Sequence, residues 1–319
     1  MAAVAEIENL VKRYREIVAL DHFRMYVNEG EILGLLGPNG SGKTTLINCM
    51  LSLLRYERGT IRLFGKEMDP EDYERKAQIG IVPQNISVVD ELTVYENMDY
   101  FCGLYIRDKK TRKQYVEEAI EFVGLEDYER SYPSQLSGGL QRRLNIACGI
   151  AHKPKLIIFD EPMVAVDSQS RNKIMEGITG LNRRGAAIIY TSHYMEEVER
   201  LCSRVVIMDK GRNIAEGTKE KLKRMLKNKE TISVEIPYFE RERLRELKEL
   251  PCAYEALYEN GRIKVKFSGG NHNLIHILDY LQRNQILFGQ VMAEQPTLND
   301  VFLEITGNQA VSLSQGEPW

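Results

Sequence analysis

The sequence predicts an α/β fold: a doubly wound domain with helices on both faces of a largely parallel sheet, followed by a small α+β domain. Short apolar runs alternate with segments of helical periodicity through the first two thirds of the chain. A glycine-rich segment, residues 37–45, separates one such apolar run from one such helix. After Gly217 the pattern changes to hairpins around one strongly amphipathic helix.

The first domain begins with predicted strands over residues 1–36, the last of which is the apolar run EILGLLG. A helix, KTTLINCMLSLL (residues 43–54), follows, and then two strands, GTIRLFG and AQIGIVPQ. Three helical segments come next: ELTVYENMDYFCGLY, TRKQYVEEAIEFVGL and LQRRLNIACGIA. Because they interrupt the alternation, we expect an inserted helical subdomain at about residues 86–150.

The alternation resumes after this block. KLIIFDE is a predicted strand, and residues 168–185 form a predicted helix that Gly185 closes. The strand AAIIYTS, the helix YMEEVERLC and the hairpin RVVIMDKGRNIAEG complete the pattern. We therefore place the first domain at residues 1–220.

Residues 221–307 are predicted to form the small α+β domain. A lysine-rich helical stretch at residues 218–230 leads into it and is interpreted as a solvated linker helix. The strand TISVEIP, a hairpin around Asn260 and Gly261, the helix HNLIHILDYLQRN and the strand FGQVMAE follow. The closing helix has Thr297 as its expected N-cap. Residues 308–319 show no periodicity and are expected to be a flexible tail.

Composition narrows the function classes. The net charge of −3 at pH 7 gives no basic field of the kind that attracts nucleic acid, so no nucleic-acid partner is expected. No apolar run approaches the roughly 18 residues of a membrane span, and no signal peptide is evident. The five cysteines are widely spaced and include no CxxC pair. This spacing argues against a disulfide framework or a zinc site and suits a reducing cytoplasm.

The segment GPNGSGKTT fits the phosphate-loop pattern G-x-x-x-x-G-K-[ST]. In this motif the backbone N–H groups surround the phosphates, Lys43 reaches the β- and γ-phosphates, and the Thr44 hydroxyl binds magnesium. The alternative, a glycine turn with a chance lysine, is weak because the match follows a predicted strand and opens a predicted helix. The predicted nucleotide-binding residues are Gly37, Pro38, Asn39, Gly40, Ser41, Gly42, Lys43, Thr44 and Thr45.

Polar residues also follow three other predicted strands: Gln84, the pair Asp160 and Glu161, and His193. Ligands of open α/β sheets bind at the carboxyl ends of the strands, so these residues are expected to meet the phosphate loop. Each alone could be a capping residue or a solvated turn. Together they predict phosphoryl transfer: Asp160 holds magnesium, Glu161 polarises the attacking water, Gln84 contacts either, and His193 bonds the γ-phosphate.

The segment PSQLSGGLQRRLNIA resembles a second phosphate cradle, because Ser137, Gly138 and Gly139 stand before a helix. With GPNGSGKTT, Gln84, LSGGLQRR, LIIFDE and His193 in this order, residues 5–220 resemble the ATP-binding subunit of an ABC transporter. The resemblance implies two subunits packed head to tail. The cradle of each, with Gln141 as a further candidate, then contacts the γ-phosphate of ATP on the other.

The resemblance also implies that Tyr14 stacks on adenine, although an ordinary strand tyrosine is the alternative and Tyr26 is near in sequence. It implies ATP and magnesium as cofactors. It further implies a separate transmembrane permease subunit that docks on the helical block and the Gln84 loop. The second ATP-binding subunit is expected to be another copy of this chain, with a heterodimer as the alternative. The implied location is cytoplasmic, peripheral on the inner face of the cell membrane.

The segment QPTLNDVFLEITG resembles the ending of subunits that serve drug, antibiotic or lipid export. We therefore expect an exporter-type ATPase. The alternatives are an importer subunit, a soluble ABC ATPase of translation or DNA repair, and a nucleotide-binding module with little hydrolysis.

One stretch departs from the family pattern. Members usually read close to P-T-x-G-L-D after the glutamate, whereas this chain reads PMVAVD. Asp167 is retained and is expected to contact the partner subunit. Met163 replaces the usual threonine and Ala165 the usual glycine. If that glycine has positive φ, alanine costs about 1 kcal/mol. We expect this departure to affect hydrolysis and cross-dimer communication rather than ATP binding.

Overall fold

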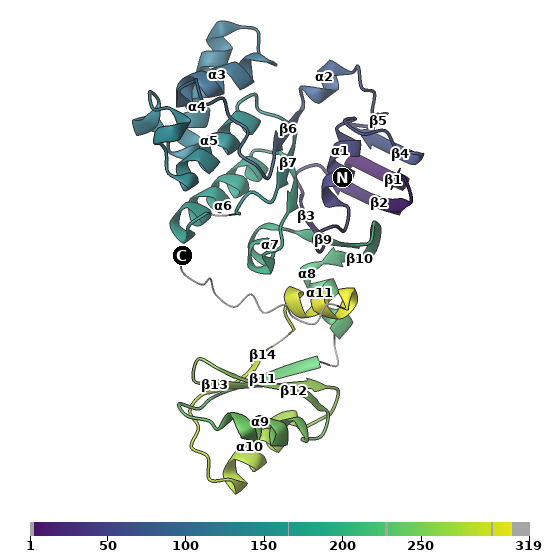
Figure 1. Cartoon of the computed structure of the whole chain (residues 1–319), viewed down its shortest axis with the longest axis vertical. Coiled ribbons are helices and arrows are strands. Elements are labelled where there is room, and N and C mark those ends of the chain that lie inside the picture. The colour runs from purple at the N-terminus through teal and green to yellow at the C-terminus, as the bar shows by residue number, and fades with distance from the viewer. Residues whose placement is uncertain (1–2, 165, 227–228, 295, 308–319) are drawn as a thin grey trace. The chain divides into compact units, whose positions relative to one another are not determined.

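The computed structural model describes residues 3–164, 166–226, 229–294 and 296–307, so Ala165 and the predicted tail lie outside the described residues. The chain divides into two compact units, with the division between Lys219 and Glu220 (Figure 1).

The first unit is built on a six-stranded sheet in the order β10-β9-β3-β8-β7-β6. Neighbouring strands from β9 to β6 are parallel, and β10 returns as an antiparallel hairpin with β9. Three inner strands are buried along their whole length, which is typical of parallel strands covered on both faces. The strands are β3 (Ile32–Leu36), β6 (Ile79–Val82), β7 (Leu156–Asp160), β8 (Ala187–Thr191), β9 (Arg204–Asp209) and β10 (Arg212–Thr218).

A second, antiparallel sheet in the order β2-β1-β4-β5 packs against the first unit's core. Its strands are β1 (Ala3–Tyr14), β2 (Ile17–Asn28), β4 (Arg58–Leu63) and β5 (Lys66–Glu67). Helix α1 (Lys43–Met50) contributes Leu46 and Ile47 to a buried apolar cluster that includes residues of both sheets. Burial between two sheets therefore fixes the helix that begins at the phosphate loop.

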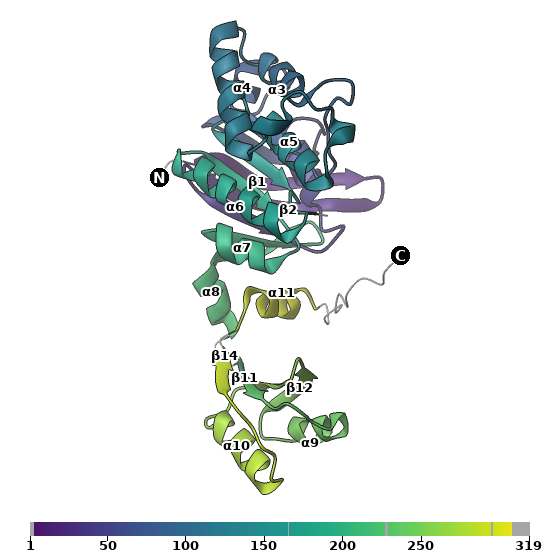
Figure 2. The ribbon, with the colours of Figure 1, turned by 90° about the vertical axis from the view of Figure 1, so that its left-hand side faces the viewer.

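The predicted helical block contains α3 (Val94–Gly103), α4 (Lys109–Val123) and α5 (Gly138–Ile150). These helices contact one another, and Figure 2 shows them as one cluster beside α6 (Ser168–Arg183) and α7 (Met195–Leu201). A capping box of Thr93 and Glu96 begins α3, and Gly124, with φ of 65°, ends α4. The first unit also contains α2 (Tyr73–Lys76) and short 3-10 turns at Glu126–Tyr128 and Pro133–Gln135.

The second unit is an antiparallel sheet, in the order β12-β13-β11-β14, covered by helices. Alternate residues of β13, including Val265 and Phe267, pack with Ile277 and Leu281 of α10 in one apolar cluster. The strands are β11 (Lys229–Glu235), β12 (Ala253–Glu259), β13 (Arg262–Ser268) and β14 (Val291–Glu294). The helices are α9 (Leu244–Lys248), α10 (Asn273–Arg283) and α11 (Leu298–Thr306), with 3-10 turns at Arg224–Leu226 and Arg241–Arg243.

Three predicted elements differ in extent from the structure. The helix predicted over residues 43–54 ends at Met50, and Ser52 has a φ of 57°. The α-helix predicted over residues 218–230 covers only α8 (Lys219–Lys223): a 3-10 turn follows at Arg224–Leu226, and Lys229 already belongs to β11, which pairs along its whole length with β13. The strand predicted over residues 288–294 begins only at Val291. In the last two cases strand pairing, which local propensity does not encode, set the boundary.

The cysteines are unpaired, and their environments differ. Cys49, Cys102, Cys148 and Cys202 are buried, whereas Cys252 in the second unit is exposed. Burial raises the pKa of Cys49 and Cys102 to about 11 and that of Cys148 to about 12. The four buried thiols therefore behave as small apolar groups at neutral pH.

Candidate phosphate-binding and catalytic site

The loop of residues 37–45 places a cation at its own centre. The Lys43 Nζ donates hydrogen bonds to the carbonyls of Gly37 at 2.8 Å and Pro38 at 3.3 Å. Lys43 is only 6% exposed. Burial lowers the pKa of Lys43, and the neighbouring carboxylates of Glu161 and Asp160 oppose that shift. The side chain thus folds back into the loop, with both predicted catalytic carboxylates near enough to act on it.

Two positions of this loop accept only glycine. A Cβ on Gly37 would lie 2.4 Å from the carbonyl oxygen of Met208. A Cβ on Gly42 would lie 2.5 Å from the carbonyl oxygen of Ala19, and its φ of 108° is unfavourable for other residues. The loop therefore packs too closely against the neighbouring backbone to carry side chains there.

The same loop contains polar groups that lack partners within the protein. The Ser41 Oγ is buried without a hydrogen-bond partner. Helix α1 has Gly42 as its N-cap and therefore no side-chain cap. Buried polar groups in native proteins are almost always hydrogen-bonded, and uncapped helix N-termini bind anions. These groups fit phosphate oxygens as their partners.

The ends of β7 and β8 hold the predicted carboxylates. Asp160 pairs in register with Thr191 on the neighbouring strand. The Thr191 hydroxyl donates to Asp160 Oδ1 at 2.7 Å and accepts the backbone N–H of Glu161 at 2.9 Å. Thr191 thus orients both acidic residues. Sequence reasoning missed it, although its place at the end of a predicted strand was the available signal.

Glu161 adopts a strained backbone conformation. Its φ is 48°, in the left-handed region that costs non-glycine residues free energy. Glu161 is 9% exposed, and its Oε2 lies 3.3 Å from Nδ1 of His193. The structure therefore brings Lys43, Asp160, Glu161 and His193 to one edge of the sheet, although their positions in the sequence are far apart.

A buried arginine of α5 connects two loops of this site. The Arg142 guanidinium donates to the carbonyls of Pro83 and Gln84 at 2.9 Å each, of Glu161 at 2.7 Å and of Pro162 at 2.6 Å. The residue is 3% exposed. Arg142 joins the loop that carries Gln84 to the turn that carries Glu161. Sequence reasoning did not assign it a role, because its partners are backbone carbonyls far away in the sequence.

Gln84 and Tyr14 lie at the surface. Gln84 is exposed just after β6. Tyr14, the last residue of β1, is 44% exposed, with Lys12 Nζ 5.2 Å from its ring centroid. The ring of Tyr26 instead lies 3.9 Å from the Arg204 guanidinium. Tyr26 is also 44% exposed, so exposure alone does not distinguish the two tyrosines.

The second cradle opens outward from the start of α5. Ser137 is the N-cap, and its Oγ accepts the N–H of Leu140 at 3.4 Å. A Cβ on Gly138 would have nothing within 4 Å. Gln141 Nε2 donates to the carbonyl of Pro133 at 2.8 Å, so this amide nitrogen braces the preceding turn. The predicted contact of Gln141 with nucleotide stays a prediction.

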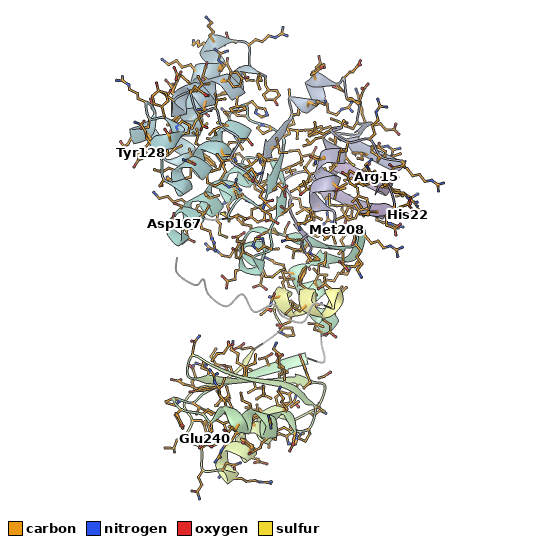
Figure 3. All side chains as sticks on the ribbon, viewed as in Figure 1. Arg15, His22, Tyr128, Asp167, Met208 and Glu240 are labelled. Carbon is orange, nitrogen blue, oxygen red and sulfur yellow. The ribbon has the colours of Figure 1, made fainter. Side chains whose placement is uncertain are left out.

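Asp167, which Figure 3 labels, is the N-cap of α6 and accepts the N–H of Ser170 at 2.9 Å. Gly139 of the second cradle faces this turn: a Cβ there would lie 3.0 Å from Asp167 Oδ2 and 2.7 Å from Ser170 Oγ. Met163 is 1% exposed, so the residue that departs from the family pattern is a core residue here. The second cradle and the Asp167 turn are therefore packed together within one chain.

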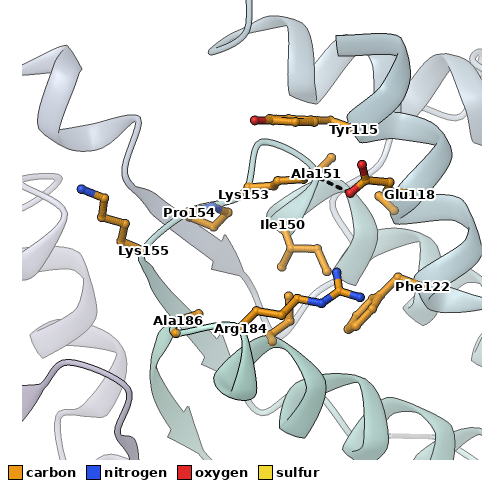
Figure 4. Close-up of a pocket in the computed structure, with 13 residues that line it drawn as sticks. Tyr115, Glu118, Phe122, Ile150, Ala151, Lys153, Pro154, Lys155, Arg184 and Ala186 are labelled. Carbon is orange, nitrogen blue, oxygen red and sulfur yellow. Dashed lines mark ion pairs between the residues drawn. The ribbon is translucent and has the colours of Figure 1, made fainter. Parts of the chain in front are cut away.

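Two cavities, of about 280 and 400 Å³, lie on either side of Phe122, between the helical cluster and α6. Figure 4 shows the smaller one, with the Lys153–Glu118 ion pair at 2.7 Å. A Cβ on Gly177 of α6 would lie 3.1 Å from the Phe122 ring. None of the predicted site residues lines either cavity. Both cavities belong to the joint between α4 and α6 rather than to the phosphate site.

Comparison with known proteins tests the resemblance. The family described as ABC transporter matches residues 20–164. The linearmycin resistance ATP-binding protein LnrL of Bacillus subtilis (strain 168) is 34% identical over 304 residues, which cover 95% of this chain and 98% of LnrL. This chain belongs to the ABC transporter ATP-binding family.

Other relatives of this ABC subunit agree. Nod factor export ATP-binding protein I of Paraburkholderia xenovorans (strain LB400) is 38% identical over 215 residues, which cover 67% of this chain and 71% of that protein. Among solved structures, the dimeric bacterial ABC transporter cassette MJ0796 has a TM-score of 0.62 and 28% identity. That match covers 67% of this chain and 98% of the cassette.

The ABC subunit binds ATP, and its hydrolysis of ATP is coupled to transport. Subunits of this family work with a membrane permease and dimerise. Among the described residues, no helix has both the length and the apolar character needed to cross a bilayer.

Proposed function

We propose that this ABC subunit powers export through a separate permease, with magnesium-ATP closing and hydrolysis reopening a pair of ATP-binding subunits. Two relatives support export, because their names state linearmycin resistance and Nod factor export. The match to LnrL spans nearly the whole chain and so includes the second unit. An importer subunit is the alternative.

The observation that carries the proposal is the meeting of Lys43, Asp160, Glu161 and His193 at one sheet edge. Lys43 is within electrostatic range of both carboxylates, and Glu161 contacts His193. Phosphoryl transfer depends mainly on positioning and charge stabilisation. This cluster supplies a cation for the phosphates, two carboxylates and a proton donor.

Magnesium would be held by oxygen atoms of Thr44, Gln84 and Asp160. Among the described residues, no group of three or more His, Cys, Asp or Glu side chains could hold a metal alone. That sparse set suits magnesium, which keeps several waters and binds through one or two carboxylates plus phosphates. When bound, the ion neutralises charge on the β- and γ-phosphates.

Glu161 and His193 have different roles in the reaction of the γ-phosphate. Glu161 accepts a hydrogen bond from the attacking water, for which its position matters more than its basicity. His193 points Nδ1 at the Glu161 carboxylate, so its Nε2 is the atom available to the γ-phosphate. His193 therefore distinguishes ATP from ADP by the presence of an acceptor.

The second cradle serves the nucleotide of the partner subunit. Ser137, Gly138 and Gly139 contact the γ-phosphate in trans, and Asp167 contacts the partner beside them. The exposed, unobstructed Gly138 supports this role, since a phosphate needs close backbone approach. We propose a homodimer, with Tyr14 as the adenine platform. A heterodimer with a related ATP-binding subunit is the alternative.

The permease docks on the helical cluster and the Gln84 loop, which keeps the subunit at the inner face of the cell membrane. Tyr100, Leu104 and Tyr105, at the end of α3, are 52%, 60% and 40% exposed. Apolar side chains gathered on a surface favour a protein contact. Arg142 would carry a displacement of this cluster to Gln84 and Glu161.

The mass of the Glu161→Gln variant in solution, with and without magnesium-ATP, tests the proposal. This change retains the shape of the side chain and removes the carboxylate, so closed dimers should accumulate. Adding Ser137→Arg should abolish the dimer, whereas Ser268→Arg, at an exposed position in the second unit, should not. A monomer that binds ATP under all conditions would contradict self-pairing.

A further inference from the structure

One buried carboxylate near the site has no part in the mechanism above. Glu197 of α7 is 2% exposed. Its Oε2 accepts hydrogen bonds from the hydroxyls of Tyr190 at 2.8 Å and Ser192 at 2.7 Å. A buried carboxylate costs free energy unless it is paired and bonded, so its place directly beneath the His193 loop requires an explanation.

Ser192 connects this carboxylate to His193. Besides donating to Glu197, its Oγ accepts the backbone N–H of Tyr194 at 2.9 Å. One hydroxyl thus fixes the chain on both sides of His193. The rings of His193 and Tyr194 also pack together, with centroids 4.2 Å apart. The orientation of the imidazole therefore depends on a turn that Glu197 holds through Ser192.

Arg171 connects the same carboxylate to α6. Its Nε lies 3.6 Å from Glu197 Oε1, and its guanidinium lies 5.0 Å from the centroid of the Tyr194 ring. At 3.6 Å the charges attract, but no hydrogen bond forms, and both atoms are buried without a hydrogen-bond partner. Arg171 stands in the first turn of α6, where its N–H bonds the carbonyl of Asp167.

We propose that Ser192, anchored by Glu197, is a positioning residue for His193 and that Arg171 couples Glu197 to the Asp167 turn. A small approach of α6 to α7 would convert the Arg171–Glu197 contact into a charge-assisted hydrogen bond. Contact of Asp167 with the partner subunit would then change the orientation of His193 in the same chain. This inference rests on the proposed role of His193.

Two matched variants test whether Ser192 positions His193. Ser192→Ala and Tyr190→Phe each remove one hydroxyl that donates to Glu197 Oε2, but only Ser192 also holds Tyr194. With the full chain, Ser192→Ala should lower kcat for magnesium-ATP about tenfold or more, with the ATP Kd within about threefold. Tyr190→Phe should leave both within about threefold, and Ser192→Thr should restore kcat. Equal effects of Ser192→Ala and Tyr190→Phe would overturn the proposal.

A second pair of variants tests the coupling of Glu197 to α6 through Arg171. Arg171→Ala removes the coupling to α6, whereas Asn172→Ala removes an exposed hydrogen bond between the same two helices, from Arg200 Nη1 to Asn172 Oδ1 at 2.9 Å. Arg171→Ala should lower kcat several-fold, and Asn172→Ala should not. If both variants lower kcat alike, Arg171 serves only to pack α6 on α7.

A measurement without turnover separates this inference from the proposed function. The chain has five histidines, so loss of one set of ring signals in His193→Ala assigns His193 by NMR. Ser192→Ala should shift or broaden those signals, and Tyr190→Phe should leave them. Unchanged signals in Ser192→Ala would refute the positioning role. Normal kcat in His193→Ala would instead refute the proposed role of His193.

Discussion

The molecule contains two glycine-bearing loops before helices, and they differ in how much of a binding site each contains. The loop of residues 37–45 is closed: Lys43 folds back onto the carbonyls of Gly37 and Pro38, and Gly42 packs against the backbone of β2. The loop of residues 137–139 is open, since a Cβ on Gly138 meets nothing within 4 Å. The first loop is closed around the Lys43 side chain, and the second presents one open face.

This difference explains how one chain can contain two loops of the phosphate-cradle type without containing two separate catalytic sites. The first has a lysine of its own, with Asp160 and Glu161 near it and His193 in contact with Glu161. The second has no lysine and no carboxylate pair of its own, and the Asp167 turn fills the space behind Gly139. We therefore propose that this cradle supports binding only when another subunit brings the nucleotide to it.

Substitution of one glycine in each loop is the most direct test of this comparison. Gly42→Ala should lower the ATP affinity of the isolated chain by about 100-fold or more, because its Cβ would overlap the Ala19 carbonyl at a φ of 108°. Gly138→Ala should leave that affinity within about threefold and weaken only the ATP-dependent dimer of the Glu161→Gln protein. Equilibrium nucleotide binding and mass in solution measure the two effects. Similar loss of ATP affinity in both variants would show that the second loop also binds the chain's own nucleotide.

Two neighbouring arginines of α5 provide the next test, because only one of them reaches the phosphate site. Arg142 reaches the Gln84 loop and the Glu161 turn, whereas Arg143 Nη1 donates to the carbonyls of Val123 and Gly124 inside the helical cluster. Lysine keeps the charge but cannot span several carbonyls. Arg142→Lys should therefore lower kcat about tenfold or more, and Arg143→Lys by about threefold or less.

The control for this pair is the ATP Kd of both variants, which should stay close to that of the unmodified chain because the phosphate loop is untouched. Circular dichroism should confirm that both variants fold. If Arg143→Lys lowers kcat as much as Arg142→Lys, the loss reflects the helical cluster as a whole.

The stability of the first unit should also depend on pH. Just past the end of α5, the buried His152 contacts the Ile79 carbonyl through Nε2 at 3.1 Å and stacks on Tyr105. Burial lowers the pKa of His152 to about 4. As pH falls below about 6.5, the unfolded chain binds a proton that the folded chain excludes, so the free energy of unfolding decreases.

At pH 5 this loss should be about 2 kcal/mol relative to pH 7.5. His152→Phe keeps an aromatic ring against Tyr105 but cannot bind the proton. Its free energy of unfolding in urea should therefore fall by about 2 kcal/mol less over the same pH range. A pH dependence equal to that of the unmodified chain would show that other groups cause the loss.

The smallest expected effect concerns the back of the second cradle. Gly139→Ala places a Cβ 2.7 Å from Ser170 Oγ, a side chain that can rotate at a cost of about 1 kcal/mol. Adding Ser170→Ala should restore about that amount, which thermal unfolding of the single and double variants measures. Equal melting temperatures for Gly139→Ala and the double variant would show that the Asp167 turn yields without strain.

Sequence patterns predicted those parts of the site that are local. The phosphate loop is one contiguous motif, and Asp160, Glu161 and His193 follow apolar runs whose parallel pairing brings their ends together. Arg142 and Glu197 could not be found this way, and the one signal for Thr191 was its place at the end of a predicted strand. The partners of Arg142 are backbone carbonyls as far as 59 residues away, and those of Thr191 and Glu197 depend on strand register and helix packing. Such contacts exist only once the tertiary structure is specified.

Because the cysteines differ in burial, the chain can be labelled at a single cysteine without any substitution. Cys252 is the exposed cysteine, and the other four are protected by burial. A maleimide dye should therefore attach to the second unit without any engineered substitution. Its emission, followed while magnesium-ATP is added, would give a direct optical report on the second unit.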